Sequence, residues 1–270
     1  MGTTTPRVRY EVTRHIADIV LDRPPVNALD FGLAEDLLHA LRQAGRDPDV
    51  RAVVLSSHSE TMFCAGLDLK AAQTWSSPEV KQFLNKLYLE LYDVQCQLGK
   101  PSIAAVRGMA RGGGMTVAIS CDMIVAGERA NFAYSEINVG LIPAIHLVRL
   151  PRLIGRHRAF DLLFNGDAFG AQDAYELGLV NRVVPDAEVM STAREAADKL
   201  AQKSPSVMKI ARDAFMQAND LGDHESISNV IDAFVQAHET EDAREGLRAF
   251  AEKRPPQWGT HGGSDWDQHV

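Results

Sequence analysis

The chain has 270 residues, of which 45% are hydrophobic and 24% are charged, and its formal net charge at pH 7 is −8. A chain of this size and composition is typical of a soluble globular protein with a substantial core. Proteins that bind nucleic acid or membrane surfaces generally present basic faces, so the acidic balance argues against both kinds of partner. A small polyanionic ligand remains compatible with it, because such a ligand needs only a local basic cluster.

The three cysteines, Cys64, Cys96 and Cys121, are scattered and show no CxxC spacing. This pattern favours free thiols in a reducing cytoplasm over a disulfide framework or a zinc site. The N-terminal segment lacks the charged and apolar regions of a signal peptide, and no apolar run approaches the roughly 18 residues of a membrane span. The histidines include no pair at metal-ligand spacing backed by a carboxylate. We therefore expect a cytoplasmic protein without a metal site.

Strand and helix patterns alternate through the first half of the chain. Apolar and polar side chains alternate on either side of Thr13–His15, which predicts a hairpin, and apolar residues after Pro78 recur at helical spacing. The predicted elements are a hairpin over 7–24, a helix over 29–46, a strand over 49–57, a helix over 78–98, a strand over 101–108, a helix over 115–121, and strands over 123–127 and 131–136.

The second half of the chain is predicted to be mainly helical. After a proline-marked loop over 140–155, the predicted elements are helices over 156–164 and 171–177, a strand over 181–185, and helices over 187–202, 205–219, 225–240 and 242–253. The last twelve residues are rich in Gly and Asp, and we expect them to be disordered. Strand–helix alternation followed by helices favours an α/β core with a helical C-terminal part.

Two predicted strand-to-helix turns contain glycine, at Gly66–Leu67 and at Gly112–Gly114. The N-terminus of a helix presents unsatisfied N–H groups and the positive end of the helix dipole. Two such ends that converge on one point would form a pair of donors suited to an oxyanion. Glycines that merely permit close packing of helix on strand explain the pattern equally well, so spacing alone leaves both interpretations open.

Other catalytic motifs are absent from the glycine-rich segment. It lacks the Gly-Lys-Ser/Thr ending of a phosphate-binding loop, the register of a dinucleotide fingerprint and the GxSxG of a serine hydrolase. Glu136 ends a short apolar segment, where a carboxylate with a raised pKa can act as a general acid or base; a capping or salt-bridged Glu is the alternative. His146 is interpreted as a partly buried or loop histidine.

Several longer segments resemble the crotonase superfamily, which comprises the enoyl-CoA hydratase/isomerase proteins. The matching segments are FCAGLDLK at 63–70, VRGMARGGG at 106–114, and residues 121–143 and 149–185. The resemblance covers roughly residues 8–258. It implies an α/β fold, a crotonase-like spiral of ββα units over residues 1–190 that holds an acyl-CoA site. It further implies a helical trimerisation region over 191–258, assembly as a homotrimer or hexamer, and a tail over 259–270.

The resemblance also implies acyl-CoA thioester substrates, with no cofactor because coenzyme A is part of the substrate. Matching the motifs residue by residue puts two backbone oxyanion donors on Leu67 and Gly113, and the acid/base on Glu136. The positions that the match assigns to the substrate and its coenzyme A moiety are Ala65, Gly66, Asp68, Leu69, Lys70, Gly114, Thr116, Gly140 and Lys253. For the two lysines, a solvated surface position is the alternative.

One departure from the family pattern bears on the reaction. Hydratases of this superfamily use two glutamates around the bound water, and here Thr116 stands at the first of these positions. A hydroxyl can hydrogen-bond to water but does not accept its proton near pH 7. Glu136 alone can still move a proton from C2 of a 3-enoyl-CoA to C4. We therefore expect an isomerase that forms 2-enoyl-CoA, with an enoyl-CoA hydratase or a catalytically silent acyl-CoA-binding trimeric scaffold as alternatives.

A second departure lies downstream of Glu136. Many hydratases carry a glycine-rich stretch there, whereas this chain has Ala-Ile-His-Leu-Val over 144–148, one residue shorter. The change alters the expected wall beside the acyl chain. No Asp stands eight residues beyond Glu136, where Ala144 is found, which argues against dienoyl-CoA isomerase and dehalogenase activities.

Overall fold

Six strands form the larger of two sheets in a computed structural model that describes residues 7–139 and 141–220, and residues 241, 245, 249, 252, 254, 257 and 259. The strand order is β1-β2-β3-β5-β7-β10. β1 and β2 are an antiparallel hairpin, as predicted, and the remaining pairs are parallel. The strands are β1 Val8–Thr13, β2 Ile16–Leu21, β3 Ala52–Ser57, β5 Ser102–Val106, β7 Met123–Gly127 and β10 Arg182–Val184.

The smaller sheet has the strand order β4-β6-β8-β9. Its strands are β4 Met62–Cys64, β6 Met109–Arg111, β8 Asn131–Ala133 and β9 Ala168–Gly170. The first three run parallel to one another, and β9 is antiparallel to β8. Successive strand pairs therefore divide between the sheets: β3, β5 and β7 join the larger sheet, and β4, β6 and β8 that follow them join the smaller one. This repeat is the predicted spiral of ββα units.

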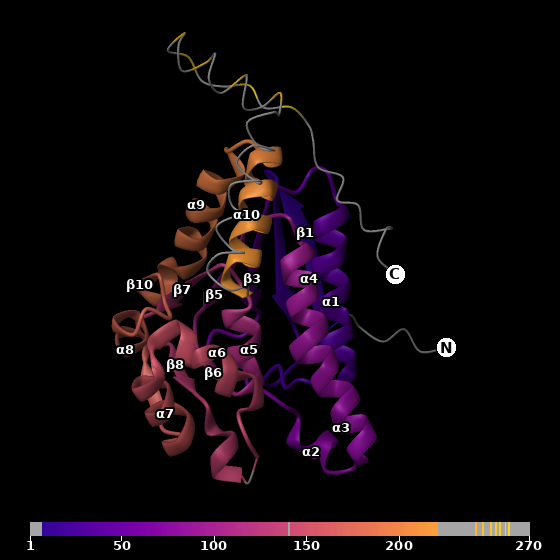
Figure 1. Cartoon of the computed structure of the whole chain (residues 1–270), viewed down its shortest axis with the longest axis vertical. Coiled ribbons are helices and arrows are strands. Elements are labelled where there is room, and N and C mark those ends of the chain that lie inside the picture. Colours follow the sequence, from indigo (N-terminus) through magenta and orange to yellow (C-terminus); the bar gives the residue numbers. More distant parts are fainter. Residues whose placement is uncertain are drawn as a thin grey trace.

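Helices cover both faces of the larger sheet (Figure 1). All six residues of β3 are buried; Val53 and Leu55 belong to the core cluster that includes α1, whereas Val54 packs in the cluster of α9. Alternate strand residues point to opposite faces, so a strand buried on both sides reads as a continuous apolar run. The longer helices are α1 Phe31–Arg46, α6 Ala144–Ile154, α7 Arg156–Asn165, α9 Val189–Ala201 and α10 Pro205–Asp220.

The remaining helical segments are short. They are α2 Leu69–Ala72, α3 Ser77–Leu84, a π-helix η1 Asn85–Glu90, α4 Leu91–Gln97, α5 Gly113–Ile119, α8 Ala171–Glu176, and the 3-10 helices η2 Ser135–Val139 and η3 Asp186–Glu188. The single helix predicted over 78–98 is thus interrupted by a π-helical turn. Its apolar spacing did predict the buried side, but one additional residue per turn leaves no signature in an apolar stripe.

Two predictions near residue 140 were wrong. The strand predicted over 131–136 ends at Ala133, so Glu136 lies in η2 rather than at a strand end. The loop predicted over 140–155 contains α6, despite Pro151 inside it. His146, Leu150 and Ile154 recur four residues apart and are all buried in α6. This buried stripe outweighs the local helix-breaking preference of the proline.

Some predictions fall outside the described residues, among them the helix over 225–240 and, apart from Gly259, the tail over 259–270. The suggested division after residue 190 falls within α9, which packs on the larger sheet. The homotrimer or hexamer stays a prediction. Within the described residues, no helix is long and apolar enough to cross a membrane.

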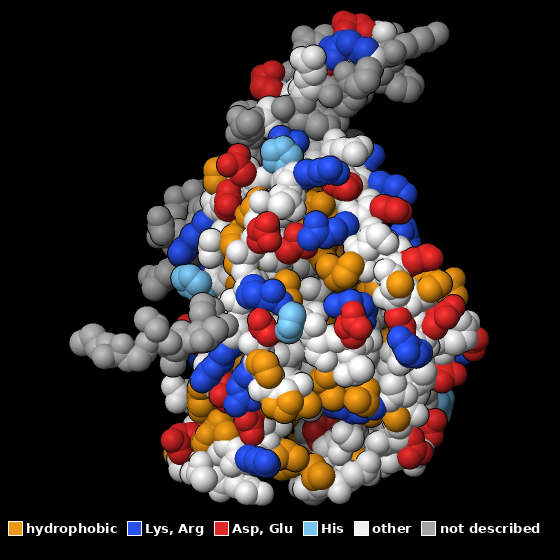
Figure 2. All heavy atoms as spheres, turned by 180° about the vertical axis from the view of Figure 1, so that it is seen from behind, with side chains coloured by type: hydrophobic (Ala, Val, Ile, Leu, Met, Phe, Trp, Pro, Cys, Tyr) orange, Lys and Arg blue, Asp and Glu red, His pale blue; other side chains and the backbone are white. Residues whose placement is uncertain are grey.

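One face of the molecule carries charges of both signs. In Figure 2, Lys and Arg side chains are interspersed with Asp and Glu, and hydrophobic side chains gather in the lower half of the view. The acidic net charge of the chain is therefore not segregated on this face.

Candidate active site

Three parallel strands of the smaller sheet end at one edge and hold the three segments of the site. β4 leads into Ala65–Leu67, β6 leads into Gly112 and Gly113, and β8 leads toward Glu136. The carboxyl ends of parallel strands lie on the same edge of a sheet, where α/β proteins commonly bind ligands. Residues that are about 70 positions apart in the chain thus converge because β4, β6 and β8 are hydrogen-bonded neighbours.

The first glycine turn directs the N–H of Leu67 away from the neighbouring segment that contains Leu29. Leu29 N donates to Gly66 O at 2.7 Å, and Asp68 N donates to Leu29 O at 2.9 Å. In an extended segment, successive N–H groups point to opposite sides, so the N–H of Leu67 points away from Leu29. It donates no backbone hydrogen bond within the described residues. The turn therefore offers one free backbone donor.

The second glycine turn offers another donor at the start of α5. Gly112 has φ +47°, a conformation that favours glycine, and its N–H donates to Ala133 O at 3.0 Å. Gly113 is the first residue of α5, so its N–H has no acceptor inside the helix. The dipole of such a short helix adds little, and the donor itself is the useful feature.

The two turns touch because Gly66 has no side chain. A Cβ added to Gly66 would lie 2.6 Å from Arg111 O and 3.1 Å from Gly113 N, and a Cβ added to Gly113 would lie 3.6 Å from Gly66 Cα. A side chain at residue 66 would push the turns apart. The glycines therefore do more than allow helix-on-strand packing: they bring the Leu67 and Gly113 segments into contact.

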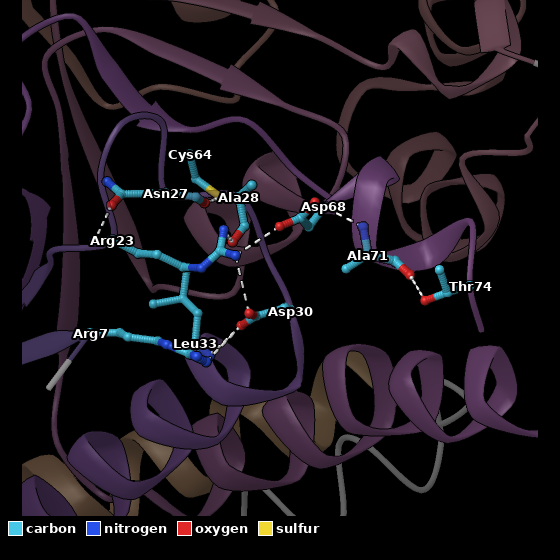
Figure 3. A network of polar contacts seen from close by, with 10 residues as sticks. All are labelled: Arg7, Arg23, Asn27, Ala28, Asp30, Leu33, Cys64, Asp68, Ala71 and Thr74. Carbon is cyan, nitrogen blue, oxygen red and sulfur yellow. Dashed lines mark hydrogen bonds and ion pairs between the residues drawn. The ribbon is translucent and has the colours of Figure 1, made fainter. Parts of the chain in front are cut away.

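Arg23 holds the first glycine turn in place through two ion pairs. Arg23 Nη2 lies 2.8 Å from Asp68 Oδ2 and 3.1 Å from Asp30 Oδ2 (Figure 3). Asp68 also caps α2, accepting from Ala71 N at 3.1 Å. Desolvation raises the pKa of Asp68, but the hydrogen bonds from Ala71 and Arg23 outweigh it and hold the pKa below its usual value. The side chain of Asp68 thus holds the turn that contains Leu67.

A cavity of about 340 Å³ opens beside both turns. Most of the groups that surround it are apolar, as in small-molecule binding sites generally. The lining residues are Ala65, Gly66, Leu67, Leu69, Val80, Phe83, Leu84, Leu87, Tyr88, Gly112, Gly113, Ser135, Glu136, Asn138, Val139, Leu141, Ile142 and Ala144. Glu136 is the only acidic or basic side chain among the described residues of this lining.

The carboxylate of Glu136 is held against the second glycine turn. A Cβ added to Gly112 would lie 2.8 Å from Glu136 Oε1. Glu136 Oε2 is buried and has no hydrogen-bond partner within the described residues. Burial raises the pKa of Glu136, because desolvation penalises the charged form. A half-buried carboxyl with a raised pKa in a cavity is a candidate general acid or base.

Tyr88 is a lining residue that the sequence analysis missed. It comes from the π-helix η1, within the stripe of apolar residues that had predicted only a packed helix face. Burial raises the pKa of Tyr88 to about 12, and the charge of Glu136 adds to this shift. Its hydroxyl is therefore protonated at neutral pH and can donate a hydrogen bond into the cavity.

The predicted site residues fall into three groups. Ala65, Gly66, Leu67, Leu69, Gly113 and Glu136 line the cavity. Asp68, Lys70, Gly114 and Thr116 do not belong to this lining. Gly140 and Lys253 lie outside the described residues. Lys70 is exposed on α2, and Gly114 lets α5 approach β4, because a Cβ there would lie 2.3 Å from Cys64 O.

Thr116 and His146 bind each other. Thr116 Oγ1 lies 3.0 Å from His146 Nε2, and the two side chains are 2% and 0% exposed. The interpretation of His146 as a partly buried or loop residue was wrong, because it is fully buried in α6. The three cysteines are free thiols, and no group of three or more His, Cys, Asp or Glu suited to a metal ion occurs among the described residues.

Known proteins share this fold and much of this sequence. The family model for enoyl-CoA hydratase/isomerase matches residues 11–261. A carnitinyl-CoA dehydratase of Proteus mirabilis is 34% identical over 90% of this chain and 94% of its own length. A probable mitochondrial enoyl-CoA hydratase of Dictyostelium discoideum is 36% identical over 89% of this chain and 86% of its own. The crystal structure of an enoyl-CoA hydratase from Bacillus anthracis superposes with a TM-score of 0.89 at 33% identity, covering 94% of this chain and all of that one.

The chain therefore belongs to the enoyl-CoA hydratase/isomerase family. The resemblance to the crotonase superfamily and the expected fold are confirmed. The family acts on acyl-CoA thioesters.

Proposed function

We propose that this protein moves a double bond in an acyl-CoA thioester, converting a 3-enoyl-CoA to a 2-enoyl-CoA with Glu136 as the only acid/base and without a cofactor. The observation that carries the proposal is the Glu136 carboxylate, whose Oε2 is buried without a partner in the cavity beside the two glycine turns. Among the described residues, the other polar side chains of that lining are Tyr88, Ser135 and Asn138.

In the proposed reaction, the backbone turns stabilise an enolate. The thioester oxygen accepts hydrogen bonds from the N–H groups of Leu67 and Gly113, and negative charge develops on that oxygen as the C2 proton leaves. A donor of this kind typically contributes about 3 kcal/mol to the transition state. Both donors belong to the backbone, so the apolar side chain of Leu67 is no obstacle.

Glu136 completes the proton balance of the reaction. Its carboxylate removes a proton from C2, and the electron pair delocalises through the thioester and the C3–C4 double bond. The protonated carboxyl then returns the proton to C4, which leaves the conjugated C2–C3 double bond and the original carboxylate. A raised pKa suits this role, because the same group must give back the proton that it takes.

Hydration or dehydration is the second candidate function. The names of the relatives favour it, since they are a carnitinyl-CoA dehydratase and a probable enoyl-CoA hydratase. Against it, Thr116 is 2% exposed, its hydroxyl is hydrogen-bonded to His146, and it does not line the cavity in which water would be held. We therefore place isomerisation first.

Two substrates separate these candidates. The protein is incubated with a 3-enoyl-CoA and with a 2-enoyl-CoA, while the absorbance of the conjugated thioester is followed and products are identified by mass. We expect absorbance to rise with the first substrate at unchanged mass. Loss of absorbance with the second substrate, with the mass of one water gained, would identify a hydratase. Binding of both thioesters without turnover would identify a catalytically silent scaffold.

A further inference from the structure

The pair formed by Thr116 and His146 has no role in the reaction described above. Its hydrogen bond, 3.0 Å between Thr116 Oγ1 and His146 Nε2, joins α5 to α6. Both side chains are withdrawn from water, at 2% and 0% exposure. Burial of polar groups is costly unless they are hydrogen-bonded. Each residue therefore supplies the hydrogen-bond partner that the buried polar atom of the other requires.

The pair carries no charge. Burial lowers the pKa of His146 to about 3, against a smaller opposing effect from the backbone of Gly112, and the charge of Arg149 lowers it further. A neutral imidazole has one N–H and one acceptor nitrogen. Nε2 meets Thr116, whereas Nδ1 is buried without a hydrogen-bond partner within the described residues. The imidazole is therefore a neutral partner that is matched to a hydroxyl.

The pair lies next to the second glycine turn, whose Gly112 and Gly113 line the substrate cavity. The backbone of Gly112 raises the pKa of the His146 ring. The same glycine is in contact with the Glu136 carboxylate, because a Cβ added to Gly112 would lie 2.8 Å from Glu136 Oε1. The ring of Tyr134, two residues before Glu136, has its centroid 4.5 Å from that of His146. His146 from α6 and Glu136 from η2 thus approach the same turn from two elements.

We propose that Thr116 and His146 are a specificity-determining pair, in which His146 occupies the space beyond residue 116 and engages its side chain, so that Glu136 alone exchanges protons with the substrate. The proposal rests on the proposed function, because it assumes acid–base chemistry in the cavity. It assigns the choice between isomerisation and hydration to two residues that do not line the cavity.

Because of this pair, we do not expect a substitution at residue 116 alone to create hydratase activity. A carboxylate introduced at residue 116 alone would meet His146 and favour the protonated imidazole, forming an ion pair. When residue 146 is shortened at the same time, the new carboxylate loses that partner and can turn to the cavity. Only the second case adds a group that holds and deprotonates water beside the substrate.

The experiment compares T116E, H146A and the double variant T116E/H146A, with T116Q/H146A as a control of equal size that has no carboxylate. The rates of 2-enoyl-CoA hydration and 3-enoyl-CoA isomerisation are measured for each. We expect the ratio of hydration to isomerisation to rise about ten-fold or more in T116E/H146A, a small part of what general acid–base catalysis can supply, and to stay within about two-fold of wild type in the other three.

Two results would overturn the proposed role of the pair. One is a ratio that rises as far in T116E as in T116E/H146A, and the other is a folded T116E/H146A whose ratio does not rise. Failure of the proposed function is distinct, because it appears as absent isomerisation by the wild type; the pair is then judged by the hydration rates alone. Thermal unfolding reports whether each variant is folded, and T116D/H146A repeats the test if T116E/H146A is not.

Discussion

At the scale of a single residue, the ionisation of Glu136 determines the pH dependence of the proposed reaction. Burial raises the pKa of this carboxyl above the ordinary value of 4.5. The group removes a C2 proton only when it is ionised, so we expect kcat/KM to fall on the acid side with a midpoint above 4.5. The pH–rate profile of the wild type measures this midpoint. A midpoint at or below the ordinary value would contradict the assignment.

The same carboxyl also contributes to stability in a predictable direction. Its folded-state pKa is raised, so between the unfolded and folded values the native state binds more protons than the unfolded state. The contribution is complete below the unfolded value and is lost as the pH rises through the folded value. Denaturant unfolding across this window should therefore show a decline in the free energy of unfolding that is absent from Glu136→Gln.

Residue identity alone predicted part of this site. Glu136 stood out because a carboxylate followed an apolar segment, and Thr116 stood out against the family pattern. The partner of Thr116 lies 30 residues away in a segment that had been predicted as a loop, so no local pattern could reveal the hydrogen bond. His146 was visible only as an isolated histidine, which is more often a packing residue than a functional one.

At the scale of elements, the site depends on how closely two turns approach. Gly112 combines a positive φ of 47° with contact to the Glu136 carboxylate. Gly112→Ala should impose backbone strain of about 1–3 kcal/mol and displace Glu136 as well. Gly178→Ala is the matched control, because its φ is +80° and nothing lies within 4 Å of an added Cβ.

We therefore expect Gly112→Ala and Gly178→Ala to lower the free energy of unfolding by comparable amounts. Only Gly112→Ala should also lower kcat, because only its new Cβ meets the carboxylate. Denaturant unfolding and steady-state kinetics on both variants make the comparison. Equal kcat values for the two variants would show that the position of Glu136 does not depend on this turn.

Some of the short strands were not predicted from the sequence. β6 and β9 have three residues each, which is too few for alternation to be recognised. The π-helical turn at Asn85–Glu90 was hidden for a different reason, because its residues continue an apolar stripe. Tyr88 was missed with it, and no signal in a single sequence would have placed it in the same cavity lining as Glu136.

At the scale of the whole molecule, long periodic segments made the fold predictable. The hairpin, α1, β3, α9 and α10 all lie within a few residues of their predicted positions. These segments did not predict which strands share a sheet, because β4, β6 and β8 pair across long stretches of chain. That pairing creates the site, and only the resemblance to a known family indicated it from sequence.

In the proposed reaction, Glu136 removes the C2 proton of a thioester whose oxygen is held by Leu67 and Gly113. Exchange of the C2 protons of butyryl-CoA in D₂O tests it directly, because a saturated thioester can form the enolate but can neither isomerise nor add water. Ser135→Ala, a change at a neighbouring lining residue, is the matched control for Glu136→Gln.

We expect the wild type and Ser135→Ala to exchange these protons, and Glu136→Gln to bind butyryl-CoA while exchange slows by about 10²-fold or more. Exchange by Glu136→Gln at the wild-type rate would contradict the account.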